Sequence, residues 1–320
     1  MASQRPTYSR KQLAKYISFI YNFPADQGLA KLSELEGLVQ RDPLKALTTL
    51  QQRQLATVSF SNVVLHYSQH HTISLDPDHL FHKLIERGLG GYCLENTGLL
   101  AIVIRSLGYQ FYTAAGRVSQ GYDSPASAGQ FYGWGHMILV VTIEGTKYTV
   151  DVGFGPNGPT RPLLLEEDQP VTSFAPAQMR MIKNNISPNV DRSQRLWIYQ
   201  TRSNPESEWK DAYCFYGIEF LPEDYEIMNF WTSQHPTSTF KKKFICTKFL
   251  LNETEDSIIG TLALTGADVK RNINGKIENL TTLTSEAERV SALQKWFNVH
   301  LHPTEVRGIK GSVAEIQTSK

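Results

Sequence analysis

The sequence predicts an α+β protein with two or three subdomains. Its 320 residues exceed the size at which one hydrophobic core normally organises a whole chain. Apolar residues recur at helical spacing in residues 1–86, whereas period-two runs of β-branched and aromatic residues begin at residue 109. Helices and strands that are segregated along the chain in this way are typical of the α+β class.

The composition excludes several classes of partner. The chain has 32 basic and 31 acidic residues, so its charge indicates neither nucleic acid nor an anionic membrane as a partner. Hydrophobic residues make up 41% of the chain, which suits a folded globular protein rather than a disordered one. The three cysteines, Cys93, Cys214 and Cys246, are an odd and sparse set that indicates a reducing compartment and no disulfide framework.

No targeting or membrane segment is expected. Residues 1–15 are polar and basic, and the apolar run 16–23 is short and is not followed by a small-residue cleavage site. No run approaches the roughly 18–20 apolar residues that span a membrane. We therefore expect a cytoplasmic protein.

The first part of the chain is predicted to be a helical bundle. Helical periodicity covers residues 9–23, 32–39 and 43–56, with Ser9 as the N-cap of the first helix, and Asp76-Pro77-Asp78 should open a further helix. This part contains five histidines whose spacing matches no metal-ligand pattern such as H-E-x-x-H, so solvated or packed side chains are expected. These histidines are His66, His70, His71, His79 and His82.

A glycine-rich turn, residues 87–92, presents Cys93 at the start of a helix that is apolar nearly all round and is therefore expected to be buried. Gly108 should end this helix in the left-handed conformation. The helix dipole and the free backbone N–H groups favour thiolate over thiol at Cys93, and the glycines allow a substrate to approach the backbone. A cysteine that merely packs in the core is the alternative interpretation, and residues farther along the chain bear on the choice.

Strand signals dominate residues 109–165, with candidate strands over 109–114, 116–118, 137–143 and 147–152. Residues 119–135 are predicted to form a long functional or mobile loop. Beyond residue 166 the chain is polar until a strand over 196–199. Further strands over 212–220, 243–251 and 257–264 precede a last helix over 284–299, which Ser285 and Glu288 cap, and a polar tail over 303–320.

His136 and Asp151 flank a predicted hairpin whose turn is Glu144-Gly145. If those two residues are the centre of the turn, Asp151 lies opposite Ile138 and shares a sheet face with His136 as its diagonal neighbour. One extra loop residue would reverse that face. With Cys93 beside them, Asp151 would orient the imidazole and His136 would take the thiol proton, giving a thiolate–imidazolium pair. Structural roles explain each residue taken singly, but the three together favour nucleophilic catalysis.

These residues resemble the arylamine N-acetyltransferase family. Residues 87–93 with Glu95 are similar to its Arg-Gly-Gly-x-Cys element, and His136-Met137 and residues 151–155 (Asp-Val-Gly-Phe-Gly) are similar to its His and Asp elements at the family's spacing. Residues 229–231 with 235–240 are similar to its third-domain segment, and Gly311-Ser312 to its C-terminal signature. The resemblance covers most of the chain.

The resemblance implies a helical bundle (1–95), a β-barrel domain with an interdomain segment (96–205) and an α/β lid with a tail (206–320), around a Cys-His-Asp core like that of transglutaminases and cysteine proteases. It also implies ping-pong transfer of an acyl group from acyl-coenzyme A through Cys93 to an aromatic amine or hydrazine, without a metal. By residue-wise match, the coenzyme A site would be lined by Tyr132, Gly133, Trp231, Thr237 and Ser312. The acceptor would be bordered by Gly135, His136 and Phe154, whose ring can stack on an aryl group.

Three departures from the family pattern stand out. Leu89 is inserted into Arg-Gly-Gly, which should move Arg87 from its usual contacts. Thr97 follows Asn96 where the family more often has asparagine, and residues 59–62 (Ser-Phe-Ser-Asn) replace Pro-Phe-Glu-Asn. None of these departures removes a member of the triad.

The donor is expected to be acetyl-CoA, with malonyl-CoA as the alternative. A second hypothesis is a thiol hydrolase or amidase, in which the same triad passes the acyl group to water. The match at residues 231–240 and the lack of a secretory signal weigh against it. A third hypothesis, a binding protein without catalysis, is disfavoured by the intact triad.

Overall fold

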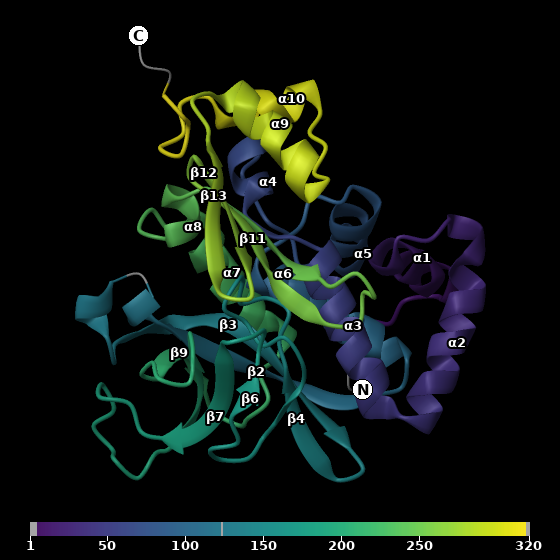
Figure 1. Cartoon of the computed structure of the whole chain (residues 1–320), viewed down its shortest axis with the longest axis vertical. Coiled ribbons are helices and arrows are strands. Elements are labelled where there is room, and N and C mark those ends of the chain that lie inside the picture. The colour runs from purple at the N-terminus through teal and green to yellow at the C-terminus, as the bar shows by residue number, and fades with distance from the viewer. Residues whose placement is uncertain (1–4, 123, 318–320) are drawn as a thin grey trace.

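The computed structural model describes residues 5–122 and 124–317. A group of helices, an eight-stranded sheet and a five-stranded sheet make up the molecule (Figure 1). The helices are α1 (Arg10–Tyr21), α2 (Gly28–Arg41), α3 (Pro43–Thr57), α4 (Val63–Tyr67), α5 (Pro77–Phe81), α6 (Cys93–Ser106), α7 (Pro222–Gln234), α8 (Thr239–Lys242), α9 (Glu286–Phe297) and α10 (Pro303–Val306). No helix in the described ranges is long and apolar enough to cross a membrane.

The N-terminal helices begin where local side chains satisfy their free N–H groups. Ser9 and Gln12 form a capping box at α1, and the Asp42 side chain accepts a hydrogen bond from Lys45 N at α3, which has proline in its first turn. Helices α1, α2, α3 and α6 bury their apolar faces in one common core. Burial of these faces holds the bundle together.

The larger sheet is antiparallel, in the order β5-β4-β3-β2-β9-β8-β7-β6. Its strands are β2 (Gln110–Ser119), β3 (Phe131–Ile143), β4 (Thr146–Val150), β5 (Leu163–Leu164), β6 (Val171–Thr172), β7 (Gln178–Asn184), β8 (Leu196–Arg202) and β9 (Lys210–Phe215). Side chains from most of these strands fill one shared core, and β5 lies close to β7. The described strands β5 and β6 are the two edges of the sheet and do not pair, so the expected β-barrel is an open sheet, curled enough to bring β5 close to β7.

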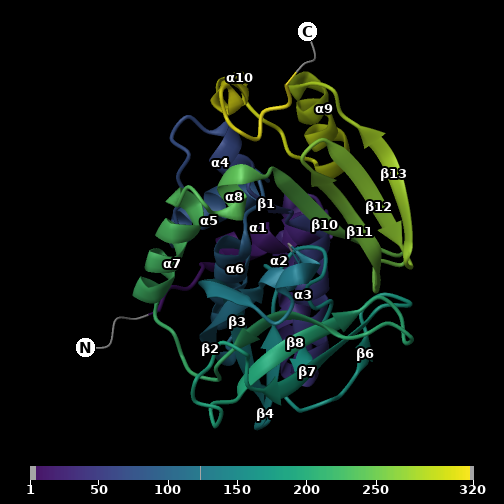
Figure 2. The same ribbon diagram turned by 90° about the vertical axis from the view of Figure 1, so that its left-hand side faces the viewer.

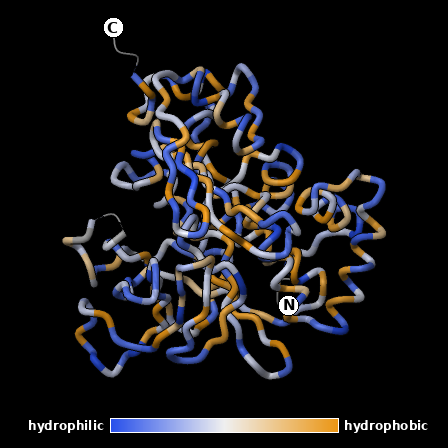
Figure 3. Tube along the Cα trace, in the orientation of Figure 1, coloured by the Kyte–Doolittle hydropathy of each residue, from blue (hydrophilic) through white to orange (hydrophobic). Residues whose placement is uncertain are grey.

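The smaller sheet runs in the order β1-β10-β11-β12-β13, and α9 packs against β10 (Figure 2). Its strands are β1 (Phe60–Ser61), β10 (Ile245–Leu251), β11 (Ile258–Thr265), β12 (Asp268–Ile273) and β13 (Lys276–Thr282). The edge strand β13 is hydrophilic and largely exposed (Figure 3), which protects a free sheet edge from pairing with other chains. As predicted, Ser285 accepts a hydrogen bond from Glu288 N at the start of α9.

Several sequence-based expectations were wrong. Much of the predicted loop 119–135 is ordered structure, because β3 begins at Phe131 and short 3-10 turns occupy part of the remainder. Helix α7 and strands β6, β7, β12 and β13 were not predicted, since their residues lack a clean apolar period. The division into domains at residues 95 and 205 stays a prediction; in the structure, residue 95 lies in α6, and β9 pairs with β2 of the larger sheet.

Candidate active site

Cys93 is the first residue of α6 and is 4% exposed. The turn before it is held by β1, since Ser61 N donates to Gly91 O at 2.9 Å and Gly91 N donates to Ser59 O at 3.1 Å. Gly90 has φ of 66°, and a Cβ on it would lie 2.4 Å from Ser59 O. The glycines of the turn are therefore required for the backbone to pass this close to β1.

A buried ion pair supports the start of α6. The Lys83 ammonium contacts one oxygen of Glu95, whose other oxygen accepts a hydrogen bond from Tyr92 N at 3.1 Å. Both side chains are buried, at 5% and 0% exposure, and the π-helical turn His82–Glu86 carries the lysine. Burial raises the pKa of Glu95, which the nearby Lys83 partly offsets. The pair fixes Tyr92, the residue that precedes Cys93.

The Leu89 insertion is accommodated next to this pair. Leu89 is 5% exposed and packs in the core beside Tyr92 and Cys93. Arg87 forms an ion pair with Glu305 at 3.0 Å, which ties the turn to α10. The inserted residue therefore joins the core, and Arg87 anchors the C-terminal part of the chain.

His136 and Asp151 meet as the hairpin register predicted. Glu144 and Gly145 both have positive φ, the geometry of a tight hairpin turn, and Leu139 pairs with Val150, which places Asp151 opposite Ile138. His136 Nε2 and Asp151 Oδ2 lie 2.7 Å apart, and both residues are 1% exposed.

Asp151 is held through both its carboxylate and its main-chain carbonyl. Its Oδ1 accepts a hydrogen bond from Gly153 N at 2.7 Å. The buried Gln51 side chain of α3 donates to the Asp151 carbonyl at 3.1 Å. The carboxylate can therefore accept from the imidazole in only one orientation, which holds Nδ1 of His136 available to the sulfur.

The sulfur of Cys93 lies at the imidazole. A bulge in β3, where His136 pairs with Gly116 and Trp134 with Arg117, exposes Gly135 O, which lies 3.2 Å from Cys93 Sγ. Burial alone would lower the pKa of His136. The Asp151 charge and hydrogen bond, with a hydrogen bond to Cys93, raise it to about 10. This environment keeps a proton on His136 at neutral pH, next to the sulfur of Cys93.

Gly153 brings the aspartate loop into contact with α6. A Cβ on it would lie 2.7 Å from Cys93 Cα and 2.8 Å from Thr97 Oγ1. Thr97, at the position where asparagine was expected, is fully buried, and its hydroxyl has no hydrogen-bond partner among the described residues. Glycine is required here because any side chain would separate the segment after Asp151 from the start of α6.

Aromatic rings form the wall behind the imidazole. The Phe154 ring lies 5.4 Å from that of His136, edge to face, and the Tyr213 ring of β9 lies 4.9 Å from it. Tyr213 is fully buried, and burial, with the Asp151 charge, raises its pKa well above the usual range, so its hydroxyl stays neutral. Tyr213 lies in the predicted strand over residues 212–220, but no sequence motif indicated that it belongs to the site.

The residues predicted to line the coenzyme A site form two groups. Tyr132 and Gly133 lie on β3 just before the bulge, and Gly133 is exposed. Trp231 of α7 is 46% exposed and stacks on His235, whose Nδ1 lies 2.8 Å from Thr237 Oγ1.

Ser312 is linked to this region through His66. One ring nitrogen of this buried histidine lies 3.4 Å from Ser312 Oγ, and the other lies 3.0 Å from Phe240 O. Burial lowers the pKa of His66 to about 4, so it is neutral and packed. No group of three potential metal ligands occurs in the described ranges.

Comparisons with known proteins identify the class. A family model described as N-acetyltransferase matches residues 43–306. The chain belongs to the arylamine N-acetyltransferase family and is therefore an acyltransferase, in a family that uses acyl-coenzyme A.

The names of individual relatives refer to two different acyl groups, malonyl and acetyl. The chain is 33% identical to N-malonyltransferase FDB2 of Gibberella moniliformis, over 95% of this chain and 92% of that protein. It is 26% identical to arylamine N-acetyltransferase, pineal gland isozyme NAT-10, of Gallus gallus, over 85% and 94%. Among solved structures, arylamine N-acetyltransferase of Mycobacterium marinum in complex with CoA is similar with a TM-score of 0.73, at 25% identity over 94% and 99% of the chains.

Proposed function

We propose that the protein transfers an acyl group from coenzyme A to an aromatic amine or hydrazine through a thioester on Cys93. The contact of Cys93 with the His136–Asp151 pair carries this proposal, because it joins a nucleophile, a proton carrier and an orienting carboxylate in one buried site.

The Cys93 thiolate attacks the thioester carbonyl of the donor and forms a tetrahedral intermediate. As the bond to the coenzyme A sulfur breaks, the His136 imidazolium donates its proton to the leaving thiolate, which leaves an acyl-Cys93 thioester. The amine then attacks this thioester, neutral His136 accepts the amine proton, and Cys93 departs as thiolate. Asp151 stays ionised throughout and holds the imidazole in place.

Malonyl-CoA is the donor that we favour over acetyl-CoA. The relatives at 33–34% identity are named N-malonyltransferases, whereas those named arylamine N-acetyltransferases are 26–28% identical. Coenzyme A would enter past β3 and the C-terminal end of α7, where Gly135 lies close to Thr232, the neighbour of the exposed Trp231. The acceptor ring would stack on Phe154, next to His136.

The test combines purified protein with malonyl- or acetyl-CoA and an arylamine. Transfer predicts release of CoA that requires the amine, parallel-line kinetics, and addition of one acyl mass to the wild-type protein but not to Cys93→Ala. Equal CoA release without amine would identify a hydrolase. CoA binding without turnover would identify a binding protein. A higher kcat/KM for acetyl-CoA than for malonyl-CoA would overturn only the choice of malonyl-CoA as donor and would leave the proposed acyl transfer intact.

A further inference from the structure

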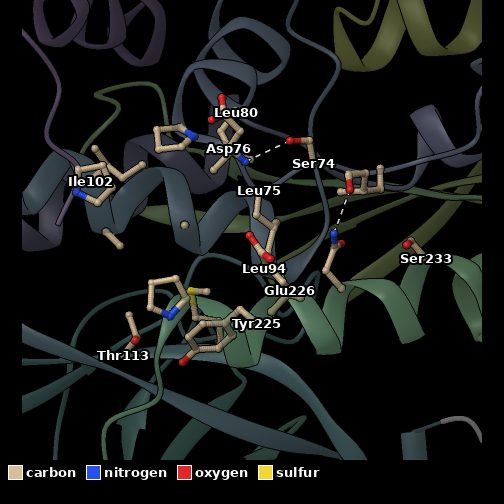
Figure 4. A pocket seen from close by; sticks show the side chains of 18 of the residues that line it. Ser74, Leu75, Asp76, Leu80, Leu94, Ile102, Thr113, Tyr225, Glu226 and Ser233 are labelled. Carbon is tan, nitrogen blue, oxygen red and sulfur yellow. Dashed lines mark hydrogen bonds between the residues drawn. The ribbon is translucent and has the colours of Figure 1, made fainter. Parts of the chain in front are cut away.

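A large cavity lies against a face of α6 that the triad does not use. Its volume is about 760 Å³, and none of the three triad residues lines it. Its other walls include residues 72–77, one face of α7 and Met137 of β3 (Figure 4). The α6 residues that line it share one helical face: Leu94, Gly98, Ala101, Ile102 and Arg105. The volume falls within the range of small-molecule sites in proteins.

The body of the cavity is apolar. Leu80, Leu94, Ile102 and Met137 are all buried and contribute aliphatic or thioether surface. Thr113 and Ser233 lie at opposite ends of the lining (Figure 4). An apolar interior of this size favours a ligand with an aryl or alkyl body.

Two arginines line the same cavity with little compensating charge. Arg105 is half-buried; it donates to Pro6 O at 3.1 Å and stacks over Phe111, but no carboxylate within residues 5–122 and 124–317 lies within ion-pair distance of it. Burial lowers the pKa of Arg105, and the nearby Arg5 charge lowers it further. Arg5 has only a long contact of 3.4 Å with the exposed Glu219, which is a weak pair.

A buried donor lies near these cations. The Tyr225 hydroxyl is buried beside Thr113 and has no hydrogen-bond partner of acceptable geometry among the described residues. The charges close enough to act on this hydroxyl are those of Asp224, Arg5 and Glu219, so Arg5 is the cation among them. Buried polar groups without a partner are rare and need an explanation, and an anionic acceptor would satisfy the hydroxyl and both guanidinium groups at once.

The two acidic residues that line the cavity, Asp76 and Glu226, do not pair with the arginines. Asp76 accepts hydrogen bonds from Asp78 N and His79 N and thereby caps α5. Glu226 is exposed to solvent. Arg105 therefore keeps a charge that no carboxylate of the described residues pairs with, next to an apolar volume, and Arg5 has only its weak contact with Glu219.

We propose that this cavity is a second small-molecule site that binds an amphipathic carboxylate, with its carboxylate at Arg5, Arg105 and Tyr225 and its aryl or alkyl body along Leu94, Ile102 and Met137. The site is separate from the predicted coenzyme A site, because Trp231, Thr237 and Ser312 do not line the cavity. It also contacts the catalytic elements. Asn229 on its wall accepts a hydrogen bond from the hydroxyl of Tyr92, the residue before the nucleophile, and donates to Ile73 O at 2.9 Å.

The test uses pyrenebutyrate, a fluorescent aryl carboxylate, titrated into the full-length protein with saturating CoA and arylamine present. The expected result is saturable binding that CoA does not displace. Arg105→Met should weaken that binding about ten- to a hundredfold, and Arg5→Gln, near the end of the chain, should weaken it in the same direction. The matched control Arg53→Met, an arginine that also stacks on an aromatic ring but lies outside this cavity, should bind like wild type.

Two further binding measurements test where pyrenebutyrate binds and whether its negative charge is required. Ala101→Phe, which fills the cavity, should abolish binding while acyl transfer continues, showing that the variant is folded. Uncharged pyrenebutanol should bind wild type and Arg105→Met equally. Displacement of pyrenebutyrate by CoA, equal affinity of wild type and Arg105→Met for pyrenebutyrate, or undiminished binding to Ala101→Phe would each overturn the proposal.

Discussion

Replacement of Asp151 by asparagine tests the geometry of the site most directly. The carboxylate accepts two hydrogen bonds, from His136 Nε2 and from Gly153 N, both at 2.7 Å. Asparagine offers one acceptor and one donor, so the amide must face one of these two N–H groups with its own N–H. If the backbone keeps the acceptor, Nε2 of the imidazole loses its proton and Nδ1–H faces Cys93, which is the wrong tautomer for a base.

The electrostatic change acts in the same direction. His136 is 1% exposed, and burial lowers its pKa while Asp151 raises it to about 10. Without the carboxylate charge, much less counteracts the lowering of the His136 pKa by burial, so this pKa should fall below its usual 6.5. The imidazolium share at pH 7.5 would then drop from nearly all to less than about one tenth. We expect kcat to fall about 10³–10⁴-fold, the magnitude typical of this change in a nucleophile–His–Asp triad.

Two measurements check this prediction. Steady-state acyl transfer gives kcat, and the rate of alkylation of Cys93 by iodoacetamide between pH 5 and 10 reports its reactive thiolate. Asp168→Asn serves as control, because that aspartate is largely exposed and forms an ion pair with Arg180, away from the site. If Asp151→Asn alkylates and turns over like wild type while remaining folded, the assigned role of Asp151 is wrong.

Three further predictions concern stability. Lys83→Met leaves the Glu95 charge buried without its partner and should lower the free energy of unfolding by about 3–5 kcal/mol in urea titrations; a loss below about 1 kcal/mol would contradict the buried pair. Gly153→Ala should lower the melting temperature and abolish transfer, because its Cβ would lie 2.7 Å from backbone atoms of the nucleophile, whereas Gly133→Ala, with no atom within 4 Å, should melt like wild type. Because the folded-state pKa of His136 is raised, its stabilising contribution should be complete below pH 6.5 and decrease as the pH rises through about 10; a melting-temperature difference from Asp151→Asn that grows above pH 10 would refute it.

Much of the local structure followed from local signals. Ser9, Pro43 and Gly108 predicted helix ends that agree with those of the structure to within a residue or so. The agreement follows because caps and left-handed glycines act on the nearest turn. The hairpin at Glu144-Gly145 also formed in the predicted register, since a two-residue turn fixes which residues face each other. Helix α7 escaped prediction because its exposed face carries Ile227 and Phe230 and therefore shows no amphipathic period.

The sequence by itself determined that Cys93 begins a helix, that His136 and Asp151 share a sheet face, and the family to which the chain belongs. Each of these depends on residues close together in the chain or on a motif. Only the tertiary structure decided that the Tyr213 ring packs against the imidazole and that Gly153 contacts α6. It also decided that a cavity with apolar walls and two arginines lies against α6. Such contacts join segments far apart in sequence. No local period specifies which faces meet, because burial and packing of the whole chain select them together.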